Sequence, residues 1–330
     1  MSGRVLVTGG LGFIGSAFVR ALAADGSAVL NVDADTYAGD ERRLHAVASG
    51  LVETVRMDVA DPALAGLVRA ERPARIVHFA AETHVTRSEG AAETFFRANV
   101  EGTRNVLDAA LAAGVPRVVH ISTDEVYGPC PDEPFGEDQK LAGEGLATSP
   151  YARSKALADD LALAYADRLD VVVARPTNCI GPWQHPEKAV PRWATRALRG
   201  ERLPVWGDGR QVRDWMFVAD AVSGLRVLAD RGARGTAYNL GPAAEGVPNI
   251  AIARMVARAA GAGEEAVYLS EYDRPQHDRR YAVSVARIGA LGWSAEHTLD
   301  RAVAETVAWY RDHADWWGTL VPDAERLYAD

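Results

Sequence analysis

The stretch that decides the fold is Arg4-Val5-Leu6-Val7-Thr8-Gly9-Gly10-Leu11-Gly12-Phe13-Ile14-Gly15. Its first half predicts a short apolar strand, and its second half is a glycine turn that leads into a predicted helix over 16–24. Glycine at 9, 12 and 15 lets the backbone turn tightly and approach a pyrophosphate at the helix N-terminus. Because the spacing is GxxGxxG rather than GxGxxG, the turn alone is also compatible with a purely structural role.

A carboxylate further along the chain strengthens the nucleotide interpretation. The next apolar strand, predicted over 28–32, leads to Asp33, about 20 residues beyond the glycine turn. A carboxylate at this place can accept a hydrogen bond from the adenosine ribose and would repel the 2′-phosphate of NADP. The glycine turn and Asp33 together predict a site for NAD.

Alternating strands and helices continue beyond this unit. Apolar runs predict strands over 52–56, 75–79, 117–122 and 170–175, and helices near 62, over 91–113 and over 151–168. This alternation predicts an α/β fold with a Rossmann-type, doubly wound parallel sheet. After Pro182 it loses its regularity, and basic and aromatic residues scatter through 183–218. We therefore expect an NAD-binding domain over 1–180, to which later segments return, and a smaller C-terminal substrate-binding lobe over 181–330.

Composition narrows the functional class. The 330 residues carry a net charge of −9, which argues against nucleic acid or an anionic membrane surface as a partner. No apolar run approaches the roughly 18 residues of a transmembrane helix, and the first strand begins too early for a signal peptide. Cys130 and Cys179 fit no metal-ligand spacing and indicate a reducing compartment. We expect a cytoplasmic protein that binds no metal.

Candidate catalytic groups follow the strand predicted over 117–122. Thr123, Asp124 and Glu125 come directly after it, where an open α/β sheet faces its ligand crevice. Tyr151 and Lys155 stand four residues apart and so share one face of the next helix. Since an ammonium beside a phenol favours the phenolate, we expect Lys155 to lower the pKa of Tyr151. The chain thus offers a base for an alcohol proton and an acid/base pair beside it.

For several polar residues at predicted strand ends, the sequence is compatible with a functional role and with a purely structural one. Asp58 can contact the adenine amino group or belong to the turn before the next helix, and Asn178 can bind a sugar or diphosphate or cap a turn. His84 can be catalytic, although an isolated histidine at a strand end is more often structural. The arginines of 183–218 suit a diphosphate, or simply a soluble surface.

Taken together, these residues resemble the extended short-chain dehydrogenase/reductase family and, within it, the dTDP-glucose 4,6-dehydratases. The resemblance covers almost the whole chain. It rests on the segments Asp33-Ala34-Asp35-Thr36-Tyr37-Ala38-Gly39, 80–85, 122–128, 149–155, 186–188, 213–215 and 273–278. The glycine turn and the Tyr-Lys pair are shared by the whole superfamily. The Thr-Asp-Glu triplet is the specific part, since related epimerases usually carry small residues there.

The resemblance implies an internal redox cycle. Tyr151 would take the C4 hydroxyl proton of the hexose while NAD accepts the C4 hydride, with Thr123 hydrogen-bonded to the oxygen. The resulting ketone acidifies the C5 proton, which Glu125 would remove while Asp124 protonates the departing C6 hydroxyl. The hydride then returns to C6. These roles require Asp124 to be protonated and Glu125 to be ionised.

The same resemblance implies the remaining site residues. NAD would be bound by Gly9, Gly12, Phe13, Ile14, Gly15, Asp33, Ala34, Asp35, Thr36, Asp58, Val59, Phe79, Ala80, Ala81, Thr83, Ala98, Tyr151, Lys155 and Cys179. The nucleotide-diphosphate hexose would be bound by Thr83, Thr123, Asn178, Lys188, Ala189, Pro204, Val205, Trp206, Arg213, Asn249, Arg274 and His277. A homodimer through the helices of 91–113 and 151–168 is also implied.

Four positions depart from the pattern of the dehydratases. Thr86 and Ser284 each stand where Asp is usual, and Cys179-Ile180 replaces the usual Asn-Tyr. They leave the triplet intact, but they leave the nucleotide base and the hexose open. Two other interpretations also stay open. A nucleotide-sugar 4-epimerase or decarboxylase would not need Asp124 and Glu125 together, and a non-catalytic NAD-binding protein should have lost Tyr151 or Lys155.

Overall fold

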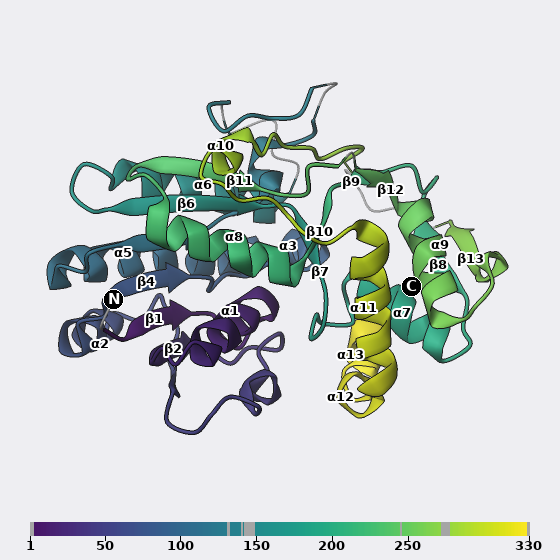
Figure 1. Cartoon of the computed structure of the whole chain (residues 1–330), viewed down its shortest axis with the longest axis horizontal. Helices are drawn as coiled ribbons and strands as arrows, with labels where there is room; N and C mark the ends of the chain where they lie inside the picture. Colours follow the sequence, from purple (N-terminus) through teal and green to yellow (C-terminus); the bar gives the residue numbers. More distant parts are fainter. Residues whose placement is uncertain are drawn as a thin grey trace.

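A seven-stranded parallel sheet forms the centre of the larger part of the molecule (Figure 1). The computed structural model describes residues 3–130, 133–139, 141, 149–244, 246–271 and 278–328. The strand order is β11-β6-β5-β4-β1-β2-β3. The strands are β1 (Val5–Thr8), β2 (Val29–Asp33), β3 (Val52–Arg56), β4 (Arg75–His78), β5 (Val118–Ile121), β6 (Val171–Pro176) and β11 (Thr236–Leu240). Every residue of β1, β2, β5 and β6 is buried, as a parallel sheet covered on both faces requires.

Helices cover both faces of this sheet. Val5 and Val7 pack on one face with α1 (Phe13–Ala24) and α8 (Val218–Arg231), whereas Leu6 packs on the other. The second face is covered by α2 (Leu64–Glu71), α5 (Gly102–Ala113) and α6 (Pro150–Ala164). This arrangement confirms the predicted Rossmann-type doubly wound fold.

The strand order reverses its direction at β1. From β1 the chain proceeds to β2 and β3 on one side, and then crosses to β4, β5 and β6 on the other. The loops that follow β1 and β4 therefore run in opposite directions and leave a crevice at the carboxyl ends of these strands. Open α/β sheets bind their ligands in such a crevice.

A smaller lobe stands at one end of the sheet, on the right in Figure 1. Its apolar core joins α7 (Ala189–Leu198), α9 (Asn249–Ala260), α11 (Leu299–Asp312) and α12 (Ala314–Gly318) to β8 (Leu203–Trp206). Its other elements are β13 (Val267–Ser270), η4 (Glu264–Ala266) and α13 (Val321–Arg326). Short strand pairs lie between the lobe and the sheet: β7 (Asn178–Ile180) with β10 (Trp215–Phe217), and β9 (Val212–Arg213) with β12 (Val247–Pro248). The division at residue 180 stays a prediction. Three elements that follow this residue in the chain belong with the sheet: β11 is its edge strand, and α8 and α10 (Ala286–Gly289) pack on it.

Some predicted helices differ in detail. The helix expected over 91–113 consists of α4 (Ala92–Phe96), a π-helical turn (Arg97–Glu101) and α5, and it ends at Gly114 with φ 66°, as its glycine predicts. A short helix that was not predicted, α3 (Val85–Gly90), precedes it. Helix α6 ends at Ala164 rather than at 168, because the next backbone N–H groups bond three residues back and tighten the turn. No helix in the described ranges combines the length and apolar character needed to span a membrane.

Candidate active site

Two cavities meet above the carboxyl edge of the sheet. The larger, about 530 Å³, is lined by the glycine turn and by the ends of β2, β4 and β5. The smaller, about 190 Å³, is lined mainly by the second lobe. The residues that line both are Thr83, Glu125, Asn178, Glu187 and Lys188. Groups at this junction can face a cofactor on one side and a substrate on the other.

The glycine turn forms a cradle that side chains would fill. Gly9 has φ +73°, and a Cβ there would lie 2.6 Å from the backbone nitrogen of Ala80. A Cβ on Gly15 would lie 2.2 Å from the carbonyl oxygen of Gly9. The turn therefore needs glycine for its own close packing, and it places the start of α1 at the wall of the larger cavity. This geometry fits a dinucleotide pyrophosphate.

Three aspartates near the predicted adenosine end are placed differently. Asp33 lies at the end of β2, and its two carboxylate oxygens accept hydrogen bonds from the backbone of Leu11 and Asp35, both over 2.9 Å. Burial raises its pKa, and these two hydrogen bonds oppose the shift. Asp35 does not line the cavity; it forms an ion pair with Arg56 instead, so its predicted contact with NAD is not supported. Asp58 lines the cavity and also caps the following turn through Ala60 N, so the two alternatives are compatible.

The other predicted cofactor residues all line the larger cavity. They are Gly9, Gly12, Phe13, Ile14, Gly15, Asp33, Ala34, Thr36, Val59, Phe79, Ala80, Ala81, Thr83, Ala98, Tyr151, Lys155 and Cys179. Ala98 reaches it from the π-helical turn. Lining residues that the sequence analysis missed are Ala38, Gly39, Arg43, Glu82, Thr94, Arg97, Gln184 and His185. Ala38, Gly39 and Glu82 belong to segments 33–39 and 80–85, which carry the family resemblance. The other five lie in no such segment and approach the cavity only through tertiary folding.

At the end of β5, the hydroxyl group of Thr123 forms hydrogen bonds with both acidic residues of the triplet, Asp124 and Glu125. Thr123 caps the short 3-10 helix η3 (Asp124–Tyr127) by accepting a hydrogen bond from Glu125 N over 3.3 Å. The same hydroxyl donates to Asp124 Oδ1 over 3.2 Å. Thr123 thus orients the carboxyl group of Asp124 and holds the backbone of Glu125.

Asp124 and Glu125 lie in unlike environments. Asp124 is buried, and its Oδ2 has no hydrogen-bond partner within the described residues. Burial, with the charges of Glu125 and Asp214, raises the pKa of Asp124 to about 8, so the group is largely protonated at neutral pH. Glu125 is only partly buried and faces both cavities. The pair can therefore offer a neutral acid at Asp124 beside a second carboxyl group, Glu125, that faces both cavities.

Tyr151 and Lys155 both reach the larger cavity from α6. Ser149 caps this helix by accepting from Ala152 N over 3.1 Å, and Pro150 occupies its first position. Lys155 Nζ donates to the carbonyl oxygen of Ile121 over 2.7 Å, which ties α6 to the end of β5. Burial lowers the pKa of Lys155 to about 8.

The expectation that Lys155 lowers the pKa of Tyr151 is wrong for the protein chain by itself. Burial raises the pKa of Tyr151 above its usual range, the charges of Glu125 and Asp124 raise it further, and the hydrogen bond with Thr123 opposes the shift. Spacing of i and i+4 brings two Cβ atoms close, but it does not decide where a long lysine side chain ends. Here the ammonium group ends at Ile121 O.

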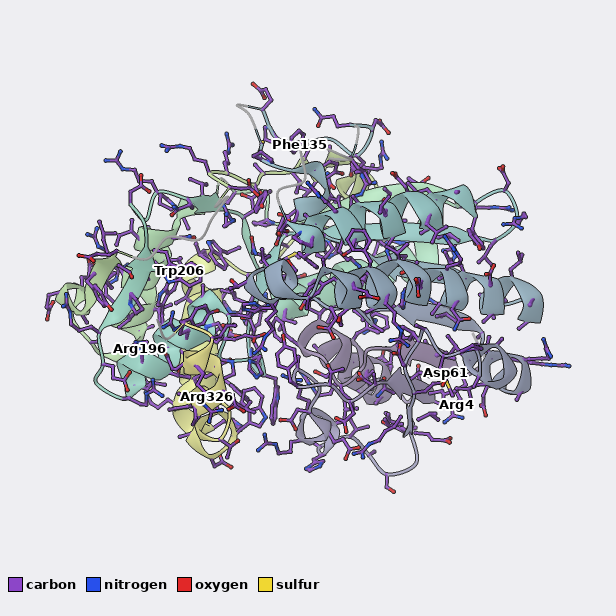
Figure 2. The ribbon with its side chains drawn as sticks, turned by 180° about the vertical axis from the view of Figure 1, so that it is seen from behind. Arg4, Asp61, Phe135, Arg196, Trp206 and Arg326 are labelled. Carbon is purple, nitrogen blue, oxygen red and sulfur yellow. The ribbon has the colours of Figure 1, made fainter. Side chains whose placement is uncertain are left out.

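The smaller cavity carries positive charge and aromatic surface. Lys188, Arg192 and Arg213 line it, and Lys188 Nζ donates to Thr83 O over 3.2 Å. Arg213 Nη2 donates to Asp278 O over 2.8 Å, and its guanidinium lies 4.3 Å from the ring of Tyr281. Trp206, at the end of β8, lies beside the C-terminal segment (Figure 2), with its ring 5.2 Å from that of Tyr328. Guanidinium, ammonium and aromatic groups suit a nucleotide diphosphate.

Most predicted substrate residues lie around this cavity. Those that line it are Thr83, Asn178, Lys188, Ala189, Pro204, Trp206, Arg213 and Asn249. Val205 is buried in the core of the lobe, since neighbouring strand residues face opposite sides, and Thr123 lines the larger cavity. Arg274 and His277 lie outside the described residues. Lining residues that the sequence analysis missed are Val85, Glu187, Arg192, Trp193, Trp215, Tyr281 and Tyr328.

His84 and the four residues that depart from the dehydratase pattern lie in different surroundings. His84 is buried, caps α3 by accepting from Arg87 N and shares a hydrogen bond with Tyr328, which supports its structural interpretation. Thr86 lines the smaller cavity and Cys179 the larger, where burial raises the pKa of its thiol. Ile180 is buried in the lobe core, and the backbone of Ser284 bonds to Phe135. Only Thr86 and Cys179 can thus touch a ligand directly.

Comparison with known proteins agrees with this geometry. Residues 5–241 match the model of the NAD dependent epimerase/dehydratase family. A dTDP-glucose 4,6-dehydratase of Streptomyces griseus is 42% identical, with 98% of each chain covered. The crystal structure of DesIV, a dTDP-glucose 4,6-dehydratase from Streptomyces venezuelae solved with NAD bound, has a TM-score of 0.90 and 39% identity, over 96% of this chain and 99% of that one. A UDP-glucose 4-epimerase of Thermus thermophilus in complex with NAD has a TM-score of 0.83 and 29% identity, over 94% and 99%. The fold, the glycine cradle and these similarities show that the chain belongs to the NAD dependent epimerase/dehydratase family.

Proposed function

We propose that this protein is an NAD-dependent dTDP-glucose 4,6-dehydratase that forms dTDP-4-keto-6-deoxyglucose. The observation that carries the proposal is the buried, protonated Asp124 beside the partly buried Glu125, at the junction of the two cavities. An epimerase needs only a reversible oxidation at C4, whereas water loss across C5 and C6 needs a separate base and acid. The dTDP nucleotide is proposed from the similarity to the Streptomyces dehydratases.

The cofactor supplies hydride chemistry. NAD would supply a hydride acceptor for C4 and a hydride donor for C6. The positive charge of its oxidised ring would favour the tyrosinate form of Tyr151, which lines the same cavity. Gly9, Gly12 and Gly15 would hold its pyrophosphate and Asp33 its ribose.

The chain's own residues move the protons. Tyr151 accepts the C4 hydroxyl proton, while Thr123 hydrogen-bonds the same oxygen. Once C4 is a ketone, the C5 proton is acidic because the carbanion is delocalised as an enolate, and Glu125 removes it. Asp124 gives its proton to the C6 hydroxyl, which leaves as water. When hydride is added at C6, Glu125 returns its proton to C5, and in the net balance the proton taken up by Tyr151 replaces the one that Asp124 gave up. Lys155 holds α6 against β5 through Ile121, so that Tyr151 keeps its position over the triplet.

We also propose that the protein forms a homodimer and is located in the cytoplasm. A homodimer is proposed through α5 and α6, since α6 carries the exposed Leu157 on its surface. Light scattering on the purified protein tests it: a dimer that becomes a monomer in Leu157→Glu would support the proposal, and a wild-type monomer would overturn it. A cytoplasmic location is proposed from the two free, buried cysteines.

The activity is tested with dTDP-glucose deuterated at C4. The expected product is lighter by one water and carries the label at C6, as shown by mass spectrometry and NMR. Unchanged mass with inverted configuration at C4 would show the epimerase instead. No reaction with dTDP-glucose, followed by water loss from another nucleotide hexose, would replace the substrate but keep the reaction class.

A further inference from the structure

The loop that follows β2 is held from three directions by a single buried guanidinium. Arg43 belongs to the 3-10 helix η1 (Glu41–Leu44), and its side chain is almost fully buried. Its Nη1 donates to Leu11 O over 2.5 Å and to Ala38 O over 2.6 Å, and its Nε donates to Trp183 O over 3.1 Å. One side chain thus joins the glycine turn, the loop after β2 and the segment before α7.

Each of these three segments forms a wall of the larger cavity. Gly9 and Gly12 belong to the same turn as Leu11. Ala34, Thr36, Ala38 and Gly39 come from the loop over 34–40, which we call the cofactor loop. Gln184 and His185 directly follow Trp183 and also line the cavity. Arg43 itself is also a lining residue. The hydrogen bonds of Arg43 thus link three segments that line the cavity.

The far end of the cofactor loop is fastened to the C-terminal helices. Asp40 Oδ2 accepts a hydrogen bond from Trp316 Nε1 over 2.7 Å, and the guanidinium of Arg43 lies 5.5 Å from the ring of Trp316. The ring of Trp316 in turn lies 5.1 Å from that of Trp183. The loop is therefore fixed between the sheet and the second lobe at two neighbouring points.

The backbone at Trp183 shows that this attachment is specific. Trp183 has φ +70°, a left-handed conformation that is unusual for a bulky residue and is kept only where its surroundings enforce it. Its carbonyl oxygen points to Arg43 Nε, and its ring packs 4.8 Å from that of Trp309. Burial lowers the pKa of Arg43 to about 10, with the charge of Asp40 opposing this shift, so the guanidinium remains charged at neutral pH and its hydrogen bonds are charge-assisted.

We propose that Arg43, together with the Asp40–Trp316 hydrogen bond, clasps the cofactor loop over the NAD cavity and slows the release of NAD. Arg43 is a positioning residue in this proposal, because it acts through the loop and the backbone of Leu11, Ala38 and Trp183. The inference rests on the proposed cofactor site, but not on the identity of the sugar nucleotide. It accounts for a charged group placed in the interior, where its desolvation is unfavourable unless it is fully hydrogen-bonded.

The test measures the release of radiolabelled NAD from the full-length protein after dilution into excess unlabelled NAD. Arg43→Met keeps the length of the side chain and removes its donors, and Trp316→Phe keeps an aromatic ring and removes the indole N–H. The control is Arg226→Met on α8, whose exposed guanidinium pairs with Asp25 on the surface. Affinity for dTDP at saturating NAD, measured by calorimetry, reports whether the substrate side is disturbed.

Release from Arg43→Met should be faster by about tenfold or more, since several charge-assisted hydrogen bonds are lost, and release from Trp316→Phe by a smaller factor. The control should release NAD at the wild-type rate, and dTDP affinity should be unchanged in all four proteins. If Arg43→Met fails to fold, Trp316→Phe decides. Wild-type release from the folded variants, or a parallel loss of dTDP affinity, would overturn the clasp. A wild-type protein that retains no labelled NAD would overturn the proposed cofactor site itself.

Discussion

The hydroxyl of Thr123 donates a hydrogen bond to Asp124 Oδ1 over 3.2 Å, while it accepts one from the backbone of Glu125 over 3.3 Å. A single side chain therefore orients the proposed acid and holds the backbone of the proposed base. The second oxygen of Asp124 is left without a partner within the described residues. It is the atom from which a proton can pass to a leaving hydroxyl.

Replacing the proposed base should separate oxidation from elimination. Glu125→Gln keeps the size and hydrogen-bonding ability of the side chain and removes its basicity. Overall turnover should fall by about 10²–10⁴-fold. Oxidation at C4 should persist, so absorbance of reduced NAD at 340 nm should build up when dTDP-glucose is added. Normal water loss in this variant would show that another group removes the C5 proton.

Replacing the proposed acid, Asp124, should remove the fall in the rate of water loss that is expected at alkaline pH. The pKa of Asp124 is raised to about 8, so its acidic form dominates below that pH and is lost above it. The rate of water loss should therefore fall as the pH rises through about 8 in the wild type. Asp124→Asn should be slower by about 10²–10⁴-fold and should lack this fall. An unchanged fall in the variant would assign the titration to a different group.

The same substitution should stabilise the fold at neutral pH. Folding raises the pKa of Asp124 from 3.8 to about 8. Between about pH 4 and 8 the folded protein therefore keeps a proton that the unfolded chain has already released. The wild type loses stability as the pH rises through this range. Asparagine does not titrate. The melting temperature of Asp124→Asn should exceed that of the wild type, and the difference should grow from pH 5 to 8. At pH 8 the free energy of unfolding should be higher in the variant by about 1–3 kcal/mol. A pH-independent difference would contradict the raised pKa.

The ion pair between Asp159 and Arg175 should matter for stability. Arg175 Nη2 and Nε each donate to a different oxygen of Asp159 over 2.8 Å, and both side chains are buried. Asp159→Ala leaves a buried guanidinium without its counter-ion and should lower the free energy of unfolding by about 3–5 kcal/mol in urea titrations. The matched control is Glu305→Ala, which removes the exposed pair with Arg301 and should cost about 1 kcal/mol or less. Equal losses in the two variants would refute the distinction.

A methyl group in the glycine cradle should abolish cofactor binding. In Gly15→Ala the new Cβ would lie 2.2 Å from Gly9 O, so the turn must open. Bound NAD, measured by chromatography after denaturation, should fall to a small fraction of the wild-type content. Gly66→Ala in α2 is the control, because its Cβ would meet no atom within 4 Å; it should keep NAD and gain about 0.5–1 kcal/mol in stability. Full NAD content in Gly15→Ala would mean that the turn does not hold the pyrophosphate.

The sequence alone was enough to predict the sheet and the place where the proposed catalytic residues gather. Runs such as Val118–Ile121 and Val171–Pro176 are mostly apolar, and all their residues are buried, including His120 and Arg175. Burial of every residue of a strand is typical of a parallel sheet covered on both faces. Because parallel strands end at one edge, the residues after them must gather there. This is why Asp33, Thr83, Asp124, Glu125 and Asn178 could be placed near one another before any contact was known.

Tertiary structure decided what local spacing cannot express. The side chain of Lys155 ends at Ile121 rather than at the phenol of Tyr151, and Asp35 pairs with Arg56 rather than facing the cavity. Arg43 and Tyr328 reach the cavities from places with no motif, because their positions depend on packing against segments more than a hundred residues away, such as Trp183 for Arg43. Electrostatics depended on the same packing: burial set the pKa of Asp124, and no sequence pattern measures burial. Periodicity fixes which face of an element a residue occupies, whereas the end of a long side chain is fixed by the groups that the completed fold brings to it.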